Sequence, residues 1–457
     1  MNIKDDFILK EIDEGYLVGG SVRDFVMGKS FNDRDIAIKN AEEFAKKLAE
    51  KFSATFITLD SDNKIYRLVL KDKENYLDIS ELRGNCIEDD LKQRDLTINA
   101  VAYDLKNEEL IDITGGLKDI KNGILRSINE ANFIDDPLRI LRVYRFMATT
   151  GFDADAELLS IVNKHKNLIN EPAKERVHDE ILKLFSGKYA SKTLICMLES
   201  GILEIIFPCV NELKQVPPNA HHHLDLIHHS IETVRQIELQ EENSVSDVLE
   251  HIYNTDLGGY PVISYIKLAG FLHDIGKFST WTIENVNGKE RHRFIKHDSV
   301  GAKLVVPLLK ELKFSNKQIE KISFLIKHHI YPSNVVASPN FDQKVMMRFV
   351  RKMEDNVIDI IFIAKADRLS AQGPEVTEDI TNANINGLNK LLNFYLEIKS
   401  ALKPLPKLLD GNDIMKILNI KQSPDLGKII QELHEAQING EVNTKSEAEL
   451  FVKNFGK

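Results

Sequence analysis

The chain has 457 residues, of which 43% are hydrophobic and 28% charged, and its formal net charge is −10. This length exceeds what one hydrophobic core usually serves, so it predicts two to four domains. No apolar run approaches the roughly 18 residues that span a bilayer, and the three widely spaced cysteines argue against a disulfide framework. We therefore expect a cytoplasmic protein with no membrane partner. The negative net charge does not exclude binding of nucleic acid, because phosphate binding needs only a local basic groove.

The first 115 residues alternate short β-rich runs with helical stretches. The segment 41–52 places Phe44, Leu48 and Phe52 on one face of a predicted helix. From about residue 120 onward the pattern is helical, and we expect no strand there. The predicted strands lie at 16–20, 35–38, 65–70, 76–80 and 110–114.

The segment 17–35, LVGGSVRDFVMGKSFNDRD, carries the densest set of chemical residues. A predicted strand runs into Gly19 and Gly20, where backbone can approach a triphosphate without interference from Cβ atoms. Arg23 follows one turn later and can meet phosphate oxygens with its forked guanidinium. Asp33 and Asp35 are two residues apart on the next strand, so their carboxylates emerge on the same face.

Asp78, in YLDIS, is a candidate third carboxylate from a neighbouring strand. Carboxylates placed in this way can hold two Mg²⁺ ions, one activating a hydroxyl and one neutralising a leaving pyrophosphate. Two aspartates on a strand are more often a solvated edge, but GGxVRD and DxD together are far more specific. The combination resembles the polymerase-β-like nucleotidyltransferases, in particular bacterial and eukaryotic tRNA CCA-adding enzymes and their poly(A) polymerase relatives.

Further motifs match this family in order. The run RDLTINA, which begins at Arg94-Asp95 and includes Asn99, resembles the family's RRDFTINA element, with Gln93 in place of the first arginine. The resemblance implies that this element contacts the ribose. Residues 112–126 resemble the next motif, a turn that joins the catalytic head to a helical neck.

Asp136 and Arg139 resemble the family's EDxxR element, whose acid and arginine pair with the incoming base. The family's leading Glu is Asp135 in this chain. Positions 136 and 139 are neighbours on a helix, where they can imitate a Watson–Crick edge. Without the preceding motifs, an ordinary ion pair on a helix would be the preferred interpretation.

Arg142 and Arg145 share a broad helix face with Arg139 and, with Arg176, are predicted to line the path of the RNA primer. A solvated basic face explains Arg142 and Arg145 equally well. Residues 408–444 resemble the C-terminal segment of family members that carry an HD domain, so the resemblance covers nearly the whole chain. Only residues 79–93 separate Asp78 from Arg94, and a short segment there is associated in this family with enzymes that stop after adding CC.

A histidine-rich region follows. His273-Asp274, in LAGFLHDIGK, is the doublet that names the HD phosphohydrolase superfamily. Mixed imidazole and carboxylate ligands suit Mn²⁺, Fe²⁺, Ni²⁺ or Zn²⁺ better than Ca²⁺. The minimal predicted ligand set is His229, His273, Asp274 and Asp367, with His297 and His328 as candidates for a second ion.

The sequence thus predicts an α+β protein with a polymerase-β-like head at 1–120, a helical neck at 121–216, an HD domain at 217–400 and a helical tail at 401–457. The predicted function is addition of CCA, or only CC, to tRNA from CTP and ATP. One alternative is a bacterial poly(A) polymerase. Another is an HD phosphodiesterase or phosphatase whose head only binds RNA.

Overall fold

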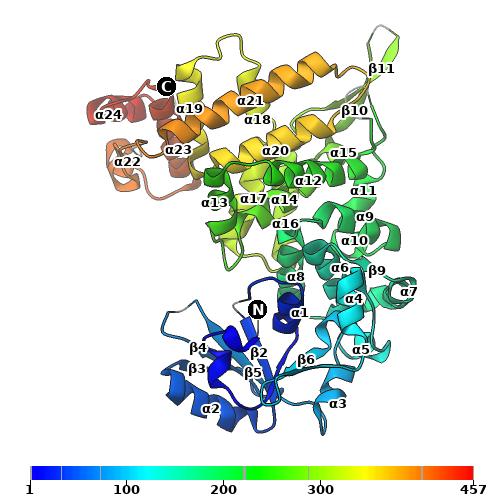
Figure 1. The fold of residues 1–457 in the computed structure, drawn as a ribbon. Helices are drawn as coiled ribbons and strands as arrows, with labels where there is room; N and C mark the ends of the chain where they lie inside the picture. Colours follow the sequence, from blue (N-terminus) through cyan, green and yellow to red (C-terminus); the bar gives the residue numbers. More distant parts are fainter. Residues whose placement is uncertain are drawn as a thin grey trace. The chain divides into compact units, whose positions relative to one another are not determined.

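The computed structural model describes residues 3–31, 33–72, 74–219, 223–286, 288–402 and 405–455. The chain forms two compact units (Figure 1). The first comprises Met1–Pro208 with Glu311–Phe314, and the second Cys209–Lys310 with Ser315–Lys457. The predicted head and most of the predicted neck therefore lie in the first unit, whereas neck residues 209–216 lie in the second with the predicted tail and nearly all of the predicted HD domain.

A seven-stranded mixed sheet organises the head, in the order β3-β4-β5-β2-β1-β6-β7. Only the central pair β2 and β5 is parallel, and the other neighbours are antiparallel. The strands are β1 (Tyr16–Val18), β2 (Asp33–Ile38), β3 (Thr55–Asp60), β4 (Ile65–Val69), β5 (Tyr76–Glu81), β6 (Val101–Asp104) and β7 (Glu109–Asp112).

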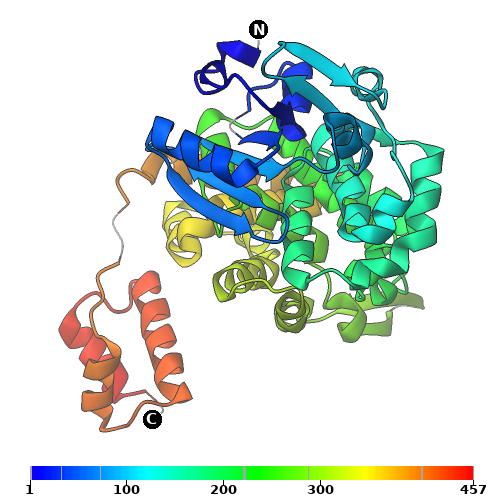
Figure 2. The same cartoon turned by 90° about the horizontal axis from the view of Figure 1, so that it is seen from below.

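Two helices of the head lie against this sheet, α1 (Gly20–Val26) and α2 (Ala41–Phe52). The bounds of α2 are those predicted, and its buried residues include Phe44 and Leu48. Figure 2 shows α2 lying across the strands, and it contacts β3, β4 and β5. Burial of one apolar stripe against a sheet explains why this amphipathic segment is helical.

The neck is built around α6 (Leu138–Thr150), which packs against α8 (Lys174–Ser186) and α9 (Ala190–Ser200). A Cβ atom at Gly187 would lie 2.3 Å from the carbonyl oxygen of Ala148, so glycine permits the close approach. The other helices of this unit are α3 (Ile87–Lys92), α4 (Gly116–Asn122), α5 (Ala131–Asp135), α7 (Ala156–His165) and α10 (Leu203–Ile206).

In the second unit, α14 (Val262–Leu272) is buried along its whole length. It packs against α12 (Leu226–Glu242), α17 (Asn316–His328) and α20 (Val357–Ser370). Its one cation, Lys267, lies 2.8 Å from buried Glu241, since a buried charge requires a partner. The remaining helices before the tail are α11 (Val210–Leu213), α13 (Ser246–Asn254), α15 (Lys277–Thr280), α16 (His297–Glu311), α18 (Tyr331–Val336), α19 (Gln343–Met353) and α21 (Glu378–Ile398).

The tail contains α22 (Gly411–Leu418), α23 (Pro424–Asn439) and α24 (Lys445–Lys453), which appear as a group of helices in Figure 2. They enclose a hydrophobic cluster of their own. Residues 403–404, next to the predicted boundary at 401, lie outside the described part of the chain.

The expectation that no strand follows residue 120 is wrong. β8 (Ile124–Leu125) pairs with β9 (Asp153–Ala154), and β10 (Trp281–Val286) pairs with β11 (Lys289–Phe294). Strands β8 and β9 are too short to give a periodic pattern in the sequence. The hairpin β10–β11 interrupts a run of helices. None of the helices in the described ranges is long and apolar enough to cross a membrane.

Candidate functional site

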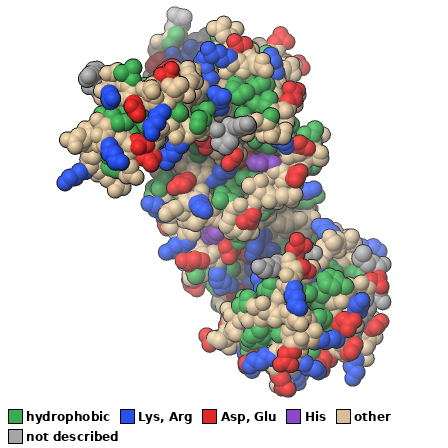
Figure 3. All heavy atoms as spheres, turned by 90° about the vertical axis from the view of Figure 1, so that its left-hand side faces the viewer, with side chains coloured by type: hydrophobic (Ala, Val, Ile, Leu, Met, Phe, Trp, Pro, Cys, Tyr) green, Lys and Arg blue, Asp and Glu red, His purple; other side chains and the backbone are tan. Residues whose placement is uncertain are grey.

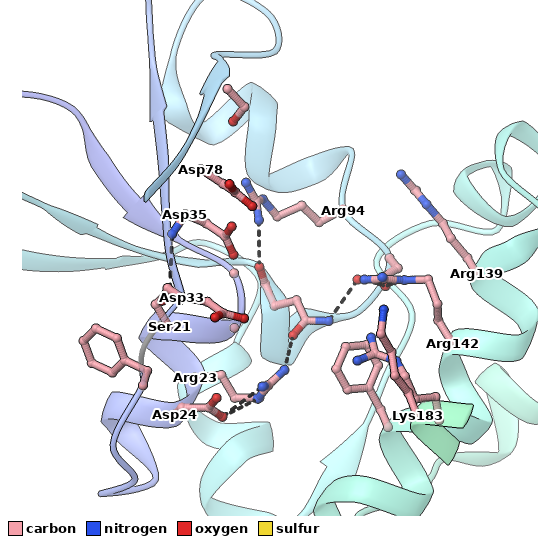
Figure 4. A pocket seen from close by; sticks show the side chains of 18 of the residues that line it. Ser21, Arg23, Asp24, Asp33, Asp35, Asp78, Arg94, Arg139, Arg142 and Lys183 are labelled. Carbon is pink, nitrogen blue, oxygen red and sulfur yellow. Dashed lines mark hydrogen bonds and ion pairs between the residues drawn. The ribbon is translucent and has the colours of Figure 1, made fainter. Parts of the chain in front are cut away.

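The predicted carboxylates meet on one face of the head sheet. In the register of β2 and β5, Asp35 lies opposite Asp78, and Asp33 lies opposite Tyr76. Because side chains alternate along a strand, Asp33, Asp35 and Asp78 share a face. Figure 4 shows all three carboxylates at one side of a cavity of about 790 Å³.

The electrostatics of these carboxylates fit a cation site. Burial, followed by the negative charge of Asp78, raises the pKa of Asp35 to about 6. Like charges held this close are disfavoured unless a cation or proton lies between them. Oxygen ligands of this kind are those that Mg²⁺ prefers. The donor set therefore fits a divalent cation that prefers oxygen ligands, and Mg²⁺ itself stays a prediction.

Arg67, on β4, is a residue of this site that the sequence analysis missed. Its Nε and Nη2 atoms donate to the two carboxylate oxygens of Asp78, each at 2.7 Å. The guanidinium also lies 4.3 Å from the ring centre of Tyr76. The forked guanidinium thus fixes the orientation of the third carboxylate.

The glycine motif brings backbone close to these acids. Gly19 has a φ of +72°, and a Cβ atom there would lie 3.3 Å from both Asp35 Oδ2 and Arg94 Nη1. Gly20 begins α1, which also carries Arg23. Arg23 donates to Asp24 at 2.9 Å and to Asn99 Oδ1 at 3.0 Å, so its guanidinium is held at the cavity wall.

The RDLTINA element lines the cavity at the place where the head meets the neck. Asp95 accepts hydrogen bonds from Asn99 Nδ2 at 3.1 Å and from Arg142 Nε at 2.7 Å. Although burial opposes ionisation of Asp95, Arg142 and these hydrogen bonds hold its pKa well below the usual value. Arg94 is oriented by Asp90, with distances of 2.9 and 2.8 Å. These pairs fix the predicted ribose-contacting element in one conformation.

The predicted base-reading residues are not paired with each other. Asp136 Oδ2 accepts from Arg176 Nη2 at 3.0 Å, across 40 residues of sequence. Within the described ranges Arg139 forms no ion pair, and burial lowers its pKa while leaving it a cation at neutral pH. Its guanidinium lies on the cavity side opposite the carboxylates (Figure 4). The N–H donors of Arg139 are therefore available to a ligand.

The other neck arginines line the same cavity. Arg145 pairs with buried Glu180 at 2.7 Å and stacks 3.8 Å from the centre of the Phe146 ring. Lys183 also faces the cavity (Figure 4), and its spacing from Arg176 on α8 could have revealed it. The expected contact of Arg142, Arg145 and Arg176 with RNA stays a prediction, because all three are engaged with acids.

In the second unit, six buried or half-buried donors converge. They come from α12, α20 and the ends of α14, α16 and α17, and form three overlapping groups whose ligand atoms lie within 4.8 Å of one another. Asp274 joins two of these groups. Its Oδ2 lies 3.1 Å from His273 Nε2, and its Oδ1 lies 3.4 Å from His297 Nε2. The donors are His229, His273, Asp274, His297, His329 and Asp367.

The hydrogen bonds of the histidines make this cluster suitable for metal. His273, His297 and His329 each place Nδ1 within 2.7 to 2.8 Å of a backbone carbonyl oxygen, so Nδ1 carries the proton. The Nε2 lone pairs of His297 and His329 then face each other at 3.3 Å. Such a contact is repulsive without a cation between the atoms, and second-shell carbonyls of this kind orient metal-ligating histidines.

His329, not His328, contributes to this cluster. The ring of His328 lies 4.5 Å from that of Phe324 and 6.4 Å from that of Tyr331. Burial and the nearby cations Lys327 and Lys352 lower its pKa to about 4. Adjacent residues at a helix end point about 100° apart, and the doublet alone does not show which one faces inward.

Comparison with known families gives the same order of domains. The family described as "Poly A polymerase head domain" matches residues 15–126. "Probable RNA and SrmB-binding site of polymerase A" matches residues 151–214, and "HD domain" matches residues 226–372. The chain thus matches, in this order, the head and RNA-binding families of poly(A) polymerases and the HD family.

Relatives in this family align along almost the whole chain. An A-adding tRNA nucleotidyltransferase of Deinococcus radiodurans is 29% identical over 96% of this chain and 95% of its own length. A CC-adding tRNA nucleotidyltransferase of Thermus thermophilus is 27% identical over 98% of this chain and 95% of its own length.

Solved structures share the fold. The CCA-adding enzyme of Thermotoga maritima, complexed with tRNA, has a TM-score of 0.53 at 20% identity, covering 97% of this chain and 92% of that one. The CCA-adding enzyme of Bacillus stearothermophilus, in complex with CTP, has a TM-score of 0.54 at 19% identity, covering 97% and 94%. The expected α+β architecture of a nucleotidyltransferase head followed by helical domains is confirmed.

Proposed function

We propose that this chain adds cytidine nucleotides to the 3′ end of tRNA, with CTP as the preferred substrate. The observation that carries this proposal is the cavity in which three carboxylates face a set of arginines from the neck. In the reaction, the tRNA 3′-oxygen forms a bond to the α-phosphorus, the bond to the β-phosphate oxygen breaks, and pyrophosphate leaves.

Each side chain has a role that its geometry supports. Asp33, Asp35 and Asp78 would hold two Mg²⁺ ions, which would supply activation of the 3′-hydroxyl and neutralisation of the pyrophosphate. Arg67 orients Asp78. Gly19 and Gly20 let the triphosphate approach the backbone, while Arg23 and Arg94 bind phosphate and ribose. Asn99 holds Arg23 in place, Asp90 holds Arg94, and Asp95 fixes the side chain of Asn99.

Base selection falls to Arg139 and Asp136. Arg139 presents donors that suit the O2 and N3 acceptors of cytosine, and Asp136 supplies an acceptor for the exocyclic amine. Because Asp136 also accepts a hydrogen bond from Arg176, that arginine positions the Asp136 carboxylate. Arg142 and Arg145 stabilise the helices that carry these two residues, through ion pairs with Asp95 and Glu180 respectively.

The test is incubation of tRNA lacking its terminal CCA with labelled CTP and ATP, separately and together. Incorporation from CTP supports the proposal. Repeated incorporation from ATP alone, with no use of CTP, would favour a poly(A) polymerase. No incorporation from either nucleotide would leave the HD hydrolase with an RNA-binding head as the better assignment.

We further propose that the six-donor cluster is a phosphohydrolase centre for two transition-metal ions. Its imidazole and carboxylate donors suit Mn²⁺, Fe²⁺, Ni²⁺ or Zn²⁺. Asp274 would help to hold both ions, because its Oδ2 lies near His229 and His273 and its Oδ1 lies near His297 and His329. Elemental analysis of the purified protein should find more than one equivalent of metal, and a stoichiometry of one or less would exclude the second ion.

A further inference from the structure

Two cations that line the cavity of the first unit have no acid partner. Arg83 and Arg139 both belong to its wall, and within the described ranges neither forms an ion pair. Each of the other cavity cations has a carboxylate within 2.7 to 3.8 Å, namely Arg23, Arg94, Arg142, Arg145, Arg176 and Lys183. Arg139 is already assigned to the base of the incoming nucleotide, so Arg83 is a cation without a role.

The backbone of Arg83 is held at a fixed point of the cavity wall. Its N–H donates to Asp90 Oδ1 at 3.3 Å, while the other oxygen of that carboxylate accepts from Arg94 Nε at 2.9 Å. Asp90 is 2% exposed. One buried carboxylate thus positions both the backbone of Arg83 and the side chain of Arg94. Because Arg83 itself is exposed, its guanidinium can meet a ligand without rearrangement of the turn.

The positive charge of Arg83 also acts on Arg139. Burial, followed by the charges of Arg83 and Arg142, lowers the pKa of the Arg139 guanidinium. Arg142 is compensated by Asp95 at 2.7 Å, whereas no acid in the described part of the chain pairs with Arg83. Like charges held close together cost free energy unless an anion lies beside them. This part of the cavity therefore favours an anionic ligand.

The order of the strands indicates the side from which an RNA end reaches the carboxylates. In the sheet, β1 and β5 flank β2 on opposite sides, and β1 leads into α1, which begins at Gly20 and carries Arg23. Figure 4 accordingly shows Arg23 and Asp78 on opposite sides of Asp35. In phosphoryl transfer the attacking and leaving oxygens are in line across the phosphorus. With the pyrophosphate over α1, the RNA 3′-oxygen therefore enters over β5, the strand that Arg83 follows in the chain.

We propose that Arg83 binds the phosphodiester that joins the last two nucleotides of the RNA, and thereby holds the attacking 3′-hydroxyl near Asp78. A forked guanidinium matches the geometry of a phosphate group. The inference rests on the proposed nucleotide addition in this cavity and identifies a contact of that site with the RNA end. The triphosphate of the incoming nucleotide offers the same chemistry, so the experiments compare the RNA with CTP.

The first measurement is the steady-state kinetics of Arg83→Gln protein. KM for tRNA lacking CCA should rise about tenfold or more, the magnitude of a lost hydrogen bond to a charged group, whereas KM for CTP should stay within about twofold of wild type. Arg83→Lys should recover part of the affinity, because lysine keeps the charge but lacks the fork. Lys71→Gln removes an exposed cation of the head outside the cavity, and as the matched control it should leave both KM values unchanged.

The second measurement is the equilibrium affinity for tRNA in the absence of nucleotide, by fluorescence anisotropy. A tRNA whose last internucleotide phosphate is replaced by a neutral methylphosphonate should bind wild-type protein about tenfold more weakly than unmodified tRNA. Arg83→Gln protein should bind the two tRNAs equally, because it has already lost the contact that the neutral linkage removes. With unmodified tRNA, the slope of log affinity against log salt concentration should be smaller in this variant by about 0.7, the contribution of one phosphate contact to a single strand.

Either of two results would overturn the inference. One is a rise in KM for CTP but not for tRNA in Arg83→Gln protein, which would assign Arg83 to the triphosphate. The other is an equal loss of affinity from the neutral linkage in wild-type and Arg83→Gln protein. Absence of nucleotide incorporation by wild-type protein would instead remove the proposed function, and the binding comparison, which needs no catalysis, would still decide whether Arg83 contacts the RNA.

Discussion

At the scale of single residues, the head site depends on Asp33 and Asp35, which β2 presents on one face. Replacing either with alanine should reduce nucleotide addition at least about a hundredfold, because loss of a metal ligand costs several kcal/mol of transition-state stabilisation and about 1.4 kcal/mol corresponds to a factor of ten. Addition of labelled CMP to tRNA measures the effect. Asp62→Ala, an exposed acid outside the cavity, is the matched control. Near-normal rates in either site variant would refute the assignment.

Arg67 offers a second prediction at this scale. Arg67→Gln removes the forked contact with Asp78, and we expect activity to fall about 10- to 100-fold, as is typical for groups that orient metal ligands. The Mg²⁺ concentration for half-maximal rate should rise, whereas tRNA affinity should not. Arg67→Lys should recover part of the loss. An unchanged Mg²⁺ dependence in Arg67→Gln protein would mean that Arg67 does not position the third carboxylate.

The sequence predicted the residues whose roles depend on local spacing. Asp33, Asp35 and Gly19 belong to one short segment whose backbone geometry follows from strand alternation and the turn. Arg67 could not be found in this way, because its contact with Asp78 depends on the register of β4 against β5. Arg176 reaches Asp136 across 40 residues. Partners set by tertiary packing leave no periodic signal.

At the scale of elements, the connection between β5 and α3 is short and is hydrogen-bonded to α3, although residues 83–86 are exposed. Residues 82–86 join the two elements, and Asn85 N donates to Asp89 Oδ2 at 3.0 Å. Gly84 has a φ of +84°, and a Cβ atom there would lie 2.5 Å from Asp89 Cβ. This segment is therefore a fixed turn, and it agrees with the short spacing seen in the sequence.

That fixed turn underlies the prediction that the enzyme adds CC and little or no terminal A. Accepting ATP after CTP requires Asp136 and Arg139 to reorient around a larger base, and packed elements switch only through a mobile part. The decisive assay offers tRNA ending in CC together with ATP alone, and uses tRNA lacking CCA with CTP as the positive control. Efficient conversion to CCA would refute the restriction without affecting the family assignment.

The same scale shows where sequence patterns mislead. Helix α2 was predicted with its bounds because one amphipathic stripe has the helical period. The strand β6 was missed because VAYD is buried at every position and therefore shows no alternation. In the hairpin β10–β11, β11 begins with three consecutive charged residues and β10 is exposed at all but its first position, so no alternation of apolar and polar residues marks a strand pair.

At the scale of the whole molecule, the net charge of −10 does not oppose binding of RNA. On the face that Figure 3 presents, basic and acidic side chains are interspersed. The arginines that would meet phosphate are instead gathered inside the cavity of the first unit. Local potential rather than net charge governs such binding, so addition should weaken as salt concentration rises.

The two candidate metal centres lie in different compact units, each formed by residues of its own unit. Their donors also differ, with only carboxylates in the head and mixed imidazole and carboxylate in the HD unit, so they should prefer different ions. We predict that His273→Ala with Asp274→Ala removes bound transition metal and any phosphoesterase activity, yet leaves CMP addition within about twofold of wild type, because independent sites change additively.

Metal analysis and both activity assays on the same preparation check this prediction. His328→Ala is the matched control, because His328 lies outside the cluster and its loss should leave metal content unchanged. A melting curve shows whether the double variant still folds, which matters because both replaced side chains are buried. Unchanged metal content in a folded double variant would reject the ligand set. Loss of CMP addition in that folded protein, with tRNA binding retained, would show that the two centres depend on each other.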